Sequence, residues 1–185
     1  TGTLSLSGNN DFTNGVTVTA AILSVDGVDA LADDDSLTIN GGTVDINAAT
    51  TVSDLAGTSG TLNLDADLTF GDDTSNELAS TITGAGGLIF NGTGTQTISG
   101  DNSEFTGDTT LNSGTTVAGS NTAFGTGTII ANGGTLRSGE TAVTLGNDIT
   151  LDADTTFRGS SQLTLTGVIT GENTFTKNDS NTVTM

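Results

Sequence analysis

The sequence predicts an all-β protein, and within that class a parallel β-helix, or β-solenoid, of roughly eight or nine coils. Short apolar runs alternate with Thr, Ser, Asn and Asp, which is the pattern of half-buried strands. Gly, Asn or Asp separates most of these runs, as turns require. The same series of motifs occurs twice at a long spacing, which is typical of repeat architectures. At about 20–22 residues per coil, the 185 residues make eight or nine coils.

The first unit of the repeat covers residues 1–93 approximately. Its strands are short, and an aromatic turn at Phe12 and a small Ala30–Ala32 corner interrupt them. Neither 29–33 nor 76–80 carries a helical apolar stripe, so we expect no helix of consequence. The strand-like runs are 2–8, 16–18, 22–25, 36–46, 60–70 and 81–90.

The second unit, residues 94–180, presents the same marks in the same order. Gly94 lies 92 residues after Gly2, and Phe105 lies 93 residues after Phe12. A third unit opens at 181–185, and we interpret residues 1–185 as a single solenoid segment of a longer array. A β-sandwich is the alternative all-β layout, but the self-similarity favours a solenoid. The further matching segments are 123–125 with 30–32, 132–136 with 40–44, 151–154 with 64–67, and 169–171 with 82–84.

The side chains available for a core are few. Hydrophobic residues make up 32% of the chain, and the only aromatic residues are seven phenylalanines. Pro is absent, as expected where interior strands donate hydrogen bonds to both neighbours. We expect every phenylalanine to point inward and stack in rows. These predicted core residues are Phe12, Phe70, Phe90, Phe105, Phe124, Phe157 and Phe175.

The charge balance excludes two classes of partner. With 22 acidic and 3 basic residues the net charge is −19, which is unsuited to a phosphate backbone or an anionic lipid surface. The chain has no run of 18 apolar residues, so we expect no direct insertion of this segment into a membrane as a helix. Without His or Cys, triads built on these residues and soft-metal sites are ruled out in this chain.

Carboxylates remain the candidates for site chemistry. Asp65 with Asp67, and Asp152 with Asp154, have the spacing that places two side chains on one strand face. Glycoside hydrolysis needs such a pair, but the chain offers no Tyr or Trp platform for a sugar, so we interpret both pairs as solvated. Recurring Thr-x-Thr triplets have uneven gaps and are not expected to line one face at every coil.

The densest acidic spots are the candidate Ca²⁺ ligands. Neither spot completes a known calcium loop, so we expect solvated acidic segments, no cofactor, and Ca²⁺ as the one ion to test. The candidate residues are Asp33, Asp34, Asp35, Asp72 and Asp73.

Taken in order, the motifs resemble the autotransporter-associated β-strand repeat. The resemblance is carried by GTLSLSG at 2–8, GTQTISG at 94–100, FTGDTTL at 105–111 and NGGTL at 132–136, and by the corner 123–125 and the closing 175–185. It implies a right-handed parallel β-helix in a large secreted or surface-displayed bacterial protein, commonly an adhesin-like passenger. Asp108 replaces the second glycine of the family's motif, and the first unit is longer after Gly42.

Three functions follow as hypotheses. The first is a non-catalytic stalk, spacer or fibre segment at the bacterial cell surface or outside the cell, with neighbouring repeats or other copies of the chain meeting it end to end. The second is a module that binds a glycan or a protein on a lateral face. The third, a polysaccharide-active enzyme, is the least favoured because the chain lacks aromatic platforms.

Overall fold

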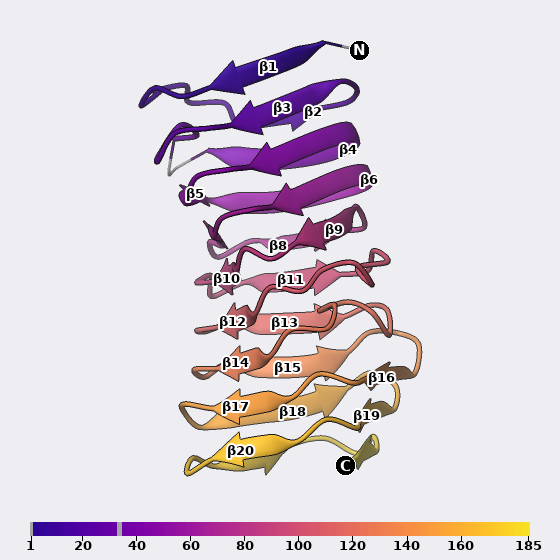
Figure 1. Cartoon of the computed structure of the whole chain (residues 1–185). Coiled ribbons are helices and arrows are strands. Elements are labelled where there is room, and N and C mark those ends of the chain that lie inside the picture. The colour runs from indigo at the N-terminus through magenta and orange to yellow at the C-terminus, as the bar shows by residue number, and fades with distance from the viewer. Residues whose placement is uncertain (1, 33–34) are drawn as a thin grey trace.

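The computed structural model describes residues 2–32 and 35–185 and confirms an all-β solenoid. Parallel strands stack through about nine turns, and the N- and C-termini lie at opposite ends of the rod (Figure 1). The described residues contain no helix. Among these residues there is accordingly no helix long and apolar enough to cross a membrane. Successive coils are 18 to 21 residues apart, as in the pairs Ser36 with Asp54 and Leu88 with Thr109.

The strands form three walls. The first wall is a sheet of seven three-residue strands. In the first six, inward, outward and inward side chains alternate, as in the buried Leu88 and Phe90 around Ile89. Its strands are β5 (Thr50–Val52), β7 (Leu68–Phe70), β10 (Leu88–Phe90), β12 (Thr109–Leu111), β14 (Ile129–Ala131), β17 (Ile149–Leu151) and β20 (Ile169–Gly171).

The second and third walls are joined in the N-terminal half by two long strands, β4 (Ser36–Ile46) and β6 (Asp54–Leu64), which contribute to both. The second wall also holds β2 (Val16–Val18), β8 (Ser75–Leu78), β11 (Thr95–Ile98), β13 (Thr115–Ala118), β15 (Thr135–Ser138), β18 (Thr155–Gly159) and β21 (Phe175–Lys177). The third wall also holds β1 (Thr3–Leu6), β3 (Ile22–Val25), β9 (Thr81–Gly84), β16 (Val143–Leu145), β19 (Leu163–Leu165) and β22 (Val183–Thr184).

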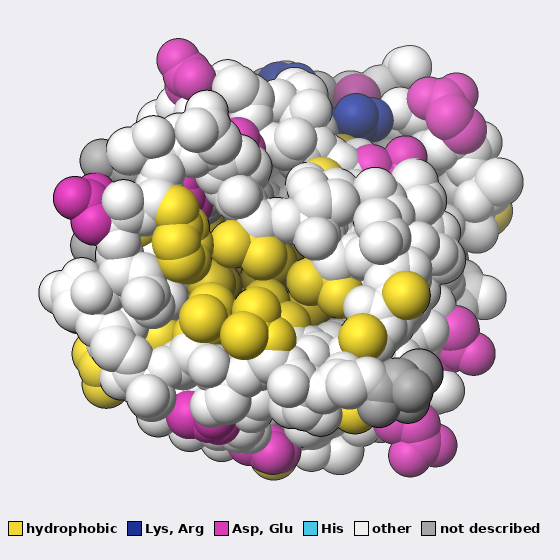
Figure 2. Space-filling model, turned by 90° about the horizontal axis from the view of Figure 1, so that it is seen from above, with side chains coloured by type: hydrophobic (Ala, Val, Ile, Leu, Met, Phe, Trp, Pro, Cys, Tyr) yellow, Lys and Arg dark blue, Asp and Glu magenta, His cyan; other side chains and the backbone are white. Residues whose placement is uncertain are grey.

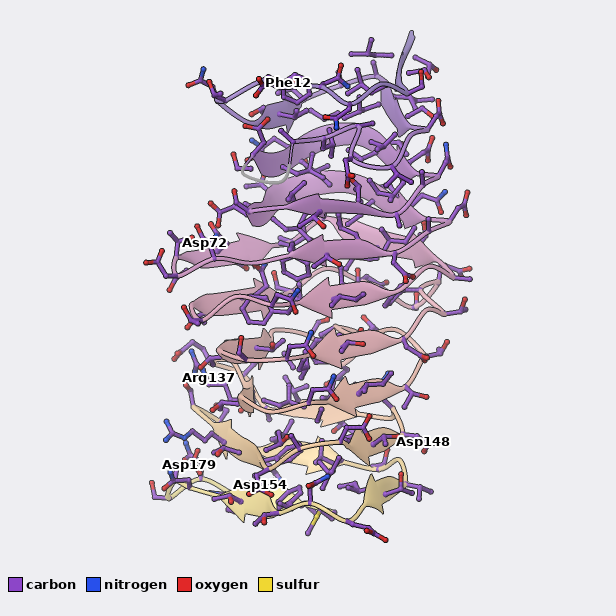
Figure 3. The ribbon with its side chains drawn as sticks, turned by 90° about the vertical axis from the view of Figure 1, so that its left-hand side faces the viewer. Phe12, Asp72, Arg137, Asp148, Asp154 and Asp179 are labelled. Atoms are coloured by element: carbon purple, nitrogen blue, oxygen red, sulfur yellow. The ribbon has the colours of Figure 1, made fainter. Side chains whose placement is uncertain are left out.

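The core is a single column of apolar side chains that runs the length of the rod. Five phenylalanines are buried in it: Phe70, Phe90, Phe105, Phe124 and Phe157. Phe12 and Phe175 are only half-buried, because they lie in the first and last coils, where one side has no further coil to cover it. Figure 3 shows Phe12 near the N-terminal end.

Between β9 and β16 the described part of the third wall has no strand, and two buried segments replace it. Phe105 pairs with Gly84 in an isolated parallel bridge, and the N–H of Thr126 then donates to the carbonyl of Phe105 at 2.9 Å. Asn102 is fully buried; its Oδ1 accepts from the N–H of Ile82, and its Nδ2 donates to the carbonyl of Ala123, both at 2.7 Å. The side-chain amide of Asn102 therefore supplies hydrogen bonds that the backbone of a strand supplies in other coils.

The two copies of the long repeat do not occupy equivalent walls. β1, which follows Gly2, lies on the third wall, whereas β11, which follows Gly94, lies on the second. On the third wall, four coils lead from Thr3 through Ile22, Thr43 and Thr61 to Thr81, so the strand that follows Gly94 lies partway round the next coil. All three walls use the same alternating pattern. The two matched motifs, which follow Gly2 and Gly94, therefore recur on different walls. The unit boundaries at residues 93 and 180 remain predictions.

Candidate ligand-binding surfaces

The structure separates the predicted calcium ligands. Asp33 and Asp34 lie outside the described residues. Asp35 was expected to lie in a solvated segment, but it is only 3% exposed. Its carboxylate packs against Gly15 in the first coil. Its Oδ1 accepts from the N–H of Gly15 at 3.1 Å, and its Oδ2 has no hydrogen-bond partner among the described residues. The carboxylate borders a hollow of about 610 Å³ near Asp11 and Asp29.

Asp72 and Asp73 lie at the corner before β8, away from Asp35. Asp72 Oδ1 accepts from both the N–H and the hydroxyl of Thr74, each at 2.7 Å. Burial alone would raise the pKa of Asp72, but these hydrogen bonds outweigh it and hold the pKa below the ordinary value. Asp73 is exposed. Over residues 2–32 and 35–185, no three acidic side chains come together in an arrangement able to hold a metal ion.

The paired carboxylates lie in turns between walls, which corrects the expectation that they share a strand face. Asp67 Oδ1 accepts from the N–H of Gly87 at 2.7 Å, and Asp154 Oδ1 accepts from the N–H of Thr174 at 2.8 Å. Asp108 and Asp148 bind the next coil in the same way. These side chains cap backbone groups at the corners, because the chain turns there without completing the ladder. Figure 3 shows Asp148 and Asp154 at the surface.

A shallow groove runs along the outward face of the second wall. Outward positions on β8, β11, β13 and β15 align Glu77, Thr97, Val117 and Arg137 in one column. The groove has a volume of about 360 Å³. Its other lining residues are Ser99, Gly119, Gly139, Glu140 and Thr141, and we call the whole feature the second-wall groove.

Cations gather at the C-terminal end of this groove. Arg158 follows Arg137 in the same column, directly opposite it on the adjacent strand β18. The sequence reasoning missed this pair, although a separation of 21 residues, one coil, was the available signal. The third cation, Lys177, forms an ion pair with Asp179, which is the one such pair in the described part of the chain. Figure 3 places Arg137 and Asp179 along one edge of the rod, opposite Asp148.

A column of hydroxyl side chains lies beside the groove. Ser75, Thr95, Thr115 and Thr135 occupy successive strands, followed by Thr156 and Thr176. The expectation concerned Thr-x-Thr pairs; this column is built of single residues, which align because successive strands pair in register from coil to coil. In the neighbouring column, Thr97 is followed by Val117, Arg137 and Arg158. The two columns therefore do not form a continuous double row of threonines.

The N-terminal end presents apolar side chains. Figure 2, viewed along the rod, shows a hydrophobic patch at the centre of this face, surrounded by polar and acidic side chains. Leu4 is 60% exposed, and it borders a hollow of about 430 Å³ with Val16 and Ile22. The end of the core column is thus uncovered on this face.

Comparison with known proteins supports the resemblance noted in the sequence. Residues 1–25 and 88–118 match the Passenger-associated-transport-repeat family. The adhesin BmaC autotransporter of Brucella suis biovar 1 (strain 1330) is 32% identical over 117 residues, which cover 62% of this chain and 3% of the relative. The chain therefore spans only a small part of that relative's length. No solved structure matches the chain.

Proposed function

Because the chain carries repeats of the autotransporter passenger type, we propose that it is a non-catalytic, adhesin-like segment of a bacterial surface or secreted protein. Its role is that of a stalk, spacer or fibre, in which length and stiffness are the functional properties. The proposal places the segment outside the cell, as the passenger-type repeats suggest.

The observation that carries this proposal is the unbroken stacking of the coils. One apolar column extends from Val18 to Leu165, and parallel ladders link every coil to the next. At the strand spacing of about 4.8 Å, nine turns make a rod roughly 40 Å long. A solenoid of this kind gains length in proportion to its number of coils, because each coil contacts only its neighbours. The excess of acidic residues keeps such a rod soluble.

The same proposal assigns a partner to the ends of the rod. The uncovered core near Leu4, and strand edges without a further coil, are the surfaces on which another coil would pack (Figure 2). We propose that neighbouring repeats of a longer chain, or other copies end to end, cover them. The much greater length of the Brucella relative supports the first of these two occupants.

Removal of one whole coil tests the proposal. Residues 109–128 form one coil, because Thr109 pairs in register with Ile129. Deletion of 109–128 should leave a cooperative thermal transition and shorten the particle by about 4.8 Å in solution scattering. Deletion of the half-coil 109–118 is the matched control and should abolish cooperative unfolding, because it puts two different walls in register. If both deletions behave alike, the rod is not modular and the stalk role fails.

A lateral binding module is the second candidate, and the second-wall groove favours it. An enzyme is not proposed, because one carboxylate of each predicted pair, Asp67 and Asp154, already accepts a hydrogen bond from a backbone N–H at a corner.

A further inference from the structure

A pair of guanidinium groups lies at the C-terminal end of the second-wall groove: Arg137 lines the groove and Arg158 follows on the next strand. Arg137 and Arg158 lie opposite each other on adjacent parallel strands, and both are on the outward face. Like charges in this arrangement oppose strand pairing. The chain has 22 acidic residues against 3 basic ones, yet no carboxylate lies within ion-pair distance of either arginine over the described ranges. The fold itself therefore gives no account of the pair.

The groove is lined by two carboxylates, Glu77 and Glu140, and neither forms an ion pair with Arg137 or Arg158 within the described ranges. Glu77 lies three strands away from Arg137 in the same column, and its Oε1 accepts from the hydroxyl of Ser99 at 2.6 Å. Arg137 donates from one guanidinium nitrogen to Ser160 Oγ at 2.7 Å, which directs its head group toward the strand of Arg158. This contact leaves most of the five N–H donors of the guanidinium for an external acceptor.

The floor of the groove suits an extended polar ligand. Val117 is only 3% exposed although it points outward, because the neighbouring side chains in its column cover it. Gly119 and Gly139 add no side chains, so the floor stays low beside the arginines. Hydroxyls of Thr97 and Thr141 line the walls of the groove, and the threonine column that includes Thr135 and Thr156 runs next to it.

We propose that the second-wall groove binds a carboxylated glycan, with Arg137 and Arg158 holding a carboxylate and the threonine hydroxyls meeting sugar hydroxyls. Guanidinium groups bind carboxylates through two parallel hydrogen bonds, which gives both affinity and orientation. A ligand rich in hydroxyls matches the hydroxyl-lined walls better than an acidic peptide does. This inference deepens the proposed adhesin-like role and rests on it.

The test uses the whole chain and a defined uronic acid oligomer. Binding of a homogalacturonan oligosaccharide is measured by titration calorimetry, with a neutral dextran oligosaccharide, a heparin oligosaccharide and a poly-glutamate peptide as comparison ligands. Arg137→Gln and Arg158→Gln should each weaken galacturonan binding at least about tenfold. Arg137→Lys keeps the positive charge but removes the planar guanidinium that donates two parallel hydrogen bonds, so it should also weaken binding. Lys177→Gln is the matched control: it removes one positive charge from β21, where Lys177 is paired with Asp179, and should leave binding unchanged.

Several results would overturn the inference. These are the absence of galacturonan binding, binding that survives the double arginine variant, or an equal loss in Lys177→Gln. Tighter binding of heparin or of poly-glutamate would reassign the groove to a sulfated glycan or to an acidic protein. Thermal unfolding and the coil-deletion experiment remain independent of all these outcomes. A failure of the glycan site is thus distinguishable from a failure of the stalk role.

Discussion

Gly84 and Phe105 form a parallel bridge that carries the third wall across the interval in which the described chain has no strand there. The backbone of Gly84 has a φ of 95°, and the Phe105 side chain is fully buried in the core. The N–H of Thr106 donates to the Gly84 carbonyl at 2.8 Å, directly beside the bridge. At this point the backbone bridge and the buried Phe105 ring supply the hydrogen bonding and the core packing that a strand supplies in other coils.

Replacement of the Phe105 ring should create a large cavity. We expect Phe105→Ala to lower the free energy of unfolding by about 3–5 kcal/mol, because a fully buried ring is lost from a narrow core. Phe12→Ala is the matched control at the half-buried N-terminal position and should cost clearly less. Equilibrium denaturation of both variants checks this. A loss below about 1 kcal/mol for Phe105→Ala would contradict the packing described here.

The glycine at the bridge should not tolerate a side chain. A Cβ on Gly84 would lie 2.2 Å from the carbonyl oxygen of Leu64, and its φ is positive. Gly84→Ala should therefore destabilise the protein by at least about 1–3 kcal/mol. At Gly139 the nearest atom to a Cβ is 3.5 Å away, so Gly139→Ala serves as the control with little effect. Equal melting temperatures for the two variants would refute the prediction.

Asn102 should matter more than an asparagine at the surface. Asn102→Leu leaves the N–H of Ile82 and the carbonyl of Ala123 without their side-chain partner in a buried setting, at a cost of about 2–4 kcal/mol. Asn112, which accepts from Asn132 in a ladder at a corner, is the control, and Asn112→Ala should cost about 1 kcal/mol or less. Chemical denaturation measures both. The reverse order would show that the amide does not replace the missing strand.

Calcium should have little effect on stability. Among the described residues no three carboxylates form a metal-binding group, so millimolar Ca²⁺ is expected to shift the melting temperature only slightly. Differential scanning fluorimetry with and without EDTA measures this shift. A large shift that disappears in Asp35→Asn, but persists in Asp73→Asn, would instead make the buried Asp35 an ion ligand.

The corner carboxylates should give the fold a defined pH dependence. Hydrogen bonds from the N–H and the hydroxyl of Thr174 hold the pKa of Asp154 below its ordinary value of 3.8. A pKa lower in the folded state stabilises the fold above the unfolded value, and this contribution is lost as pH falls through the folded pKa. The pKa values of Asp26, Asp101 and Asp179 are also lowered by hydrogen bonds.

Asp154→Asn isolates this effect, because the amide oxygen can still accept from Thr174. The wild-type protein should melt at a higher temperature than this variant above pH 4 or so, and the difference should shrink as the pH falls below 3.8. Melting curves between pH 2 and pH 7 or so would check this. A difference that grows on acidification would have the wrong sign.

Local features of the sequence were sufficient to predict the fold class. The alternation in 88–90 indicates a strand, and the Asn-Gly-Gly sequence at 40–42 indicates a corner. Both features depend only on residues that are neighbours in the chain. The same patterns predicted coils of about 20 residues. Phe105 could be placed in the core because it is the one large apolar residue in the polar stretch 99–110.

Only the tertiary structure decided which wall each motif occupies and which side chains meet. All three walls use the same alternating pattern, so the sequence could not show that β1 and β11 lie on different walls. The proximity of Arg137 and Arg158 depends on a coil register of 21 residues, and the burial of Asp35 depends on how the first coil covers it. These relationships arise between coils, where a shift of one residue reverses the face of every side chain, and no short stretch of sequence records that shift.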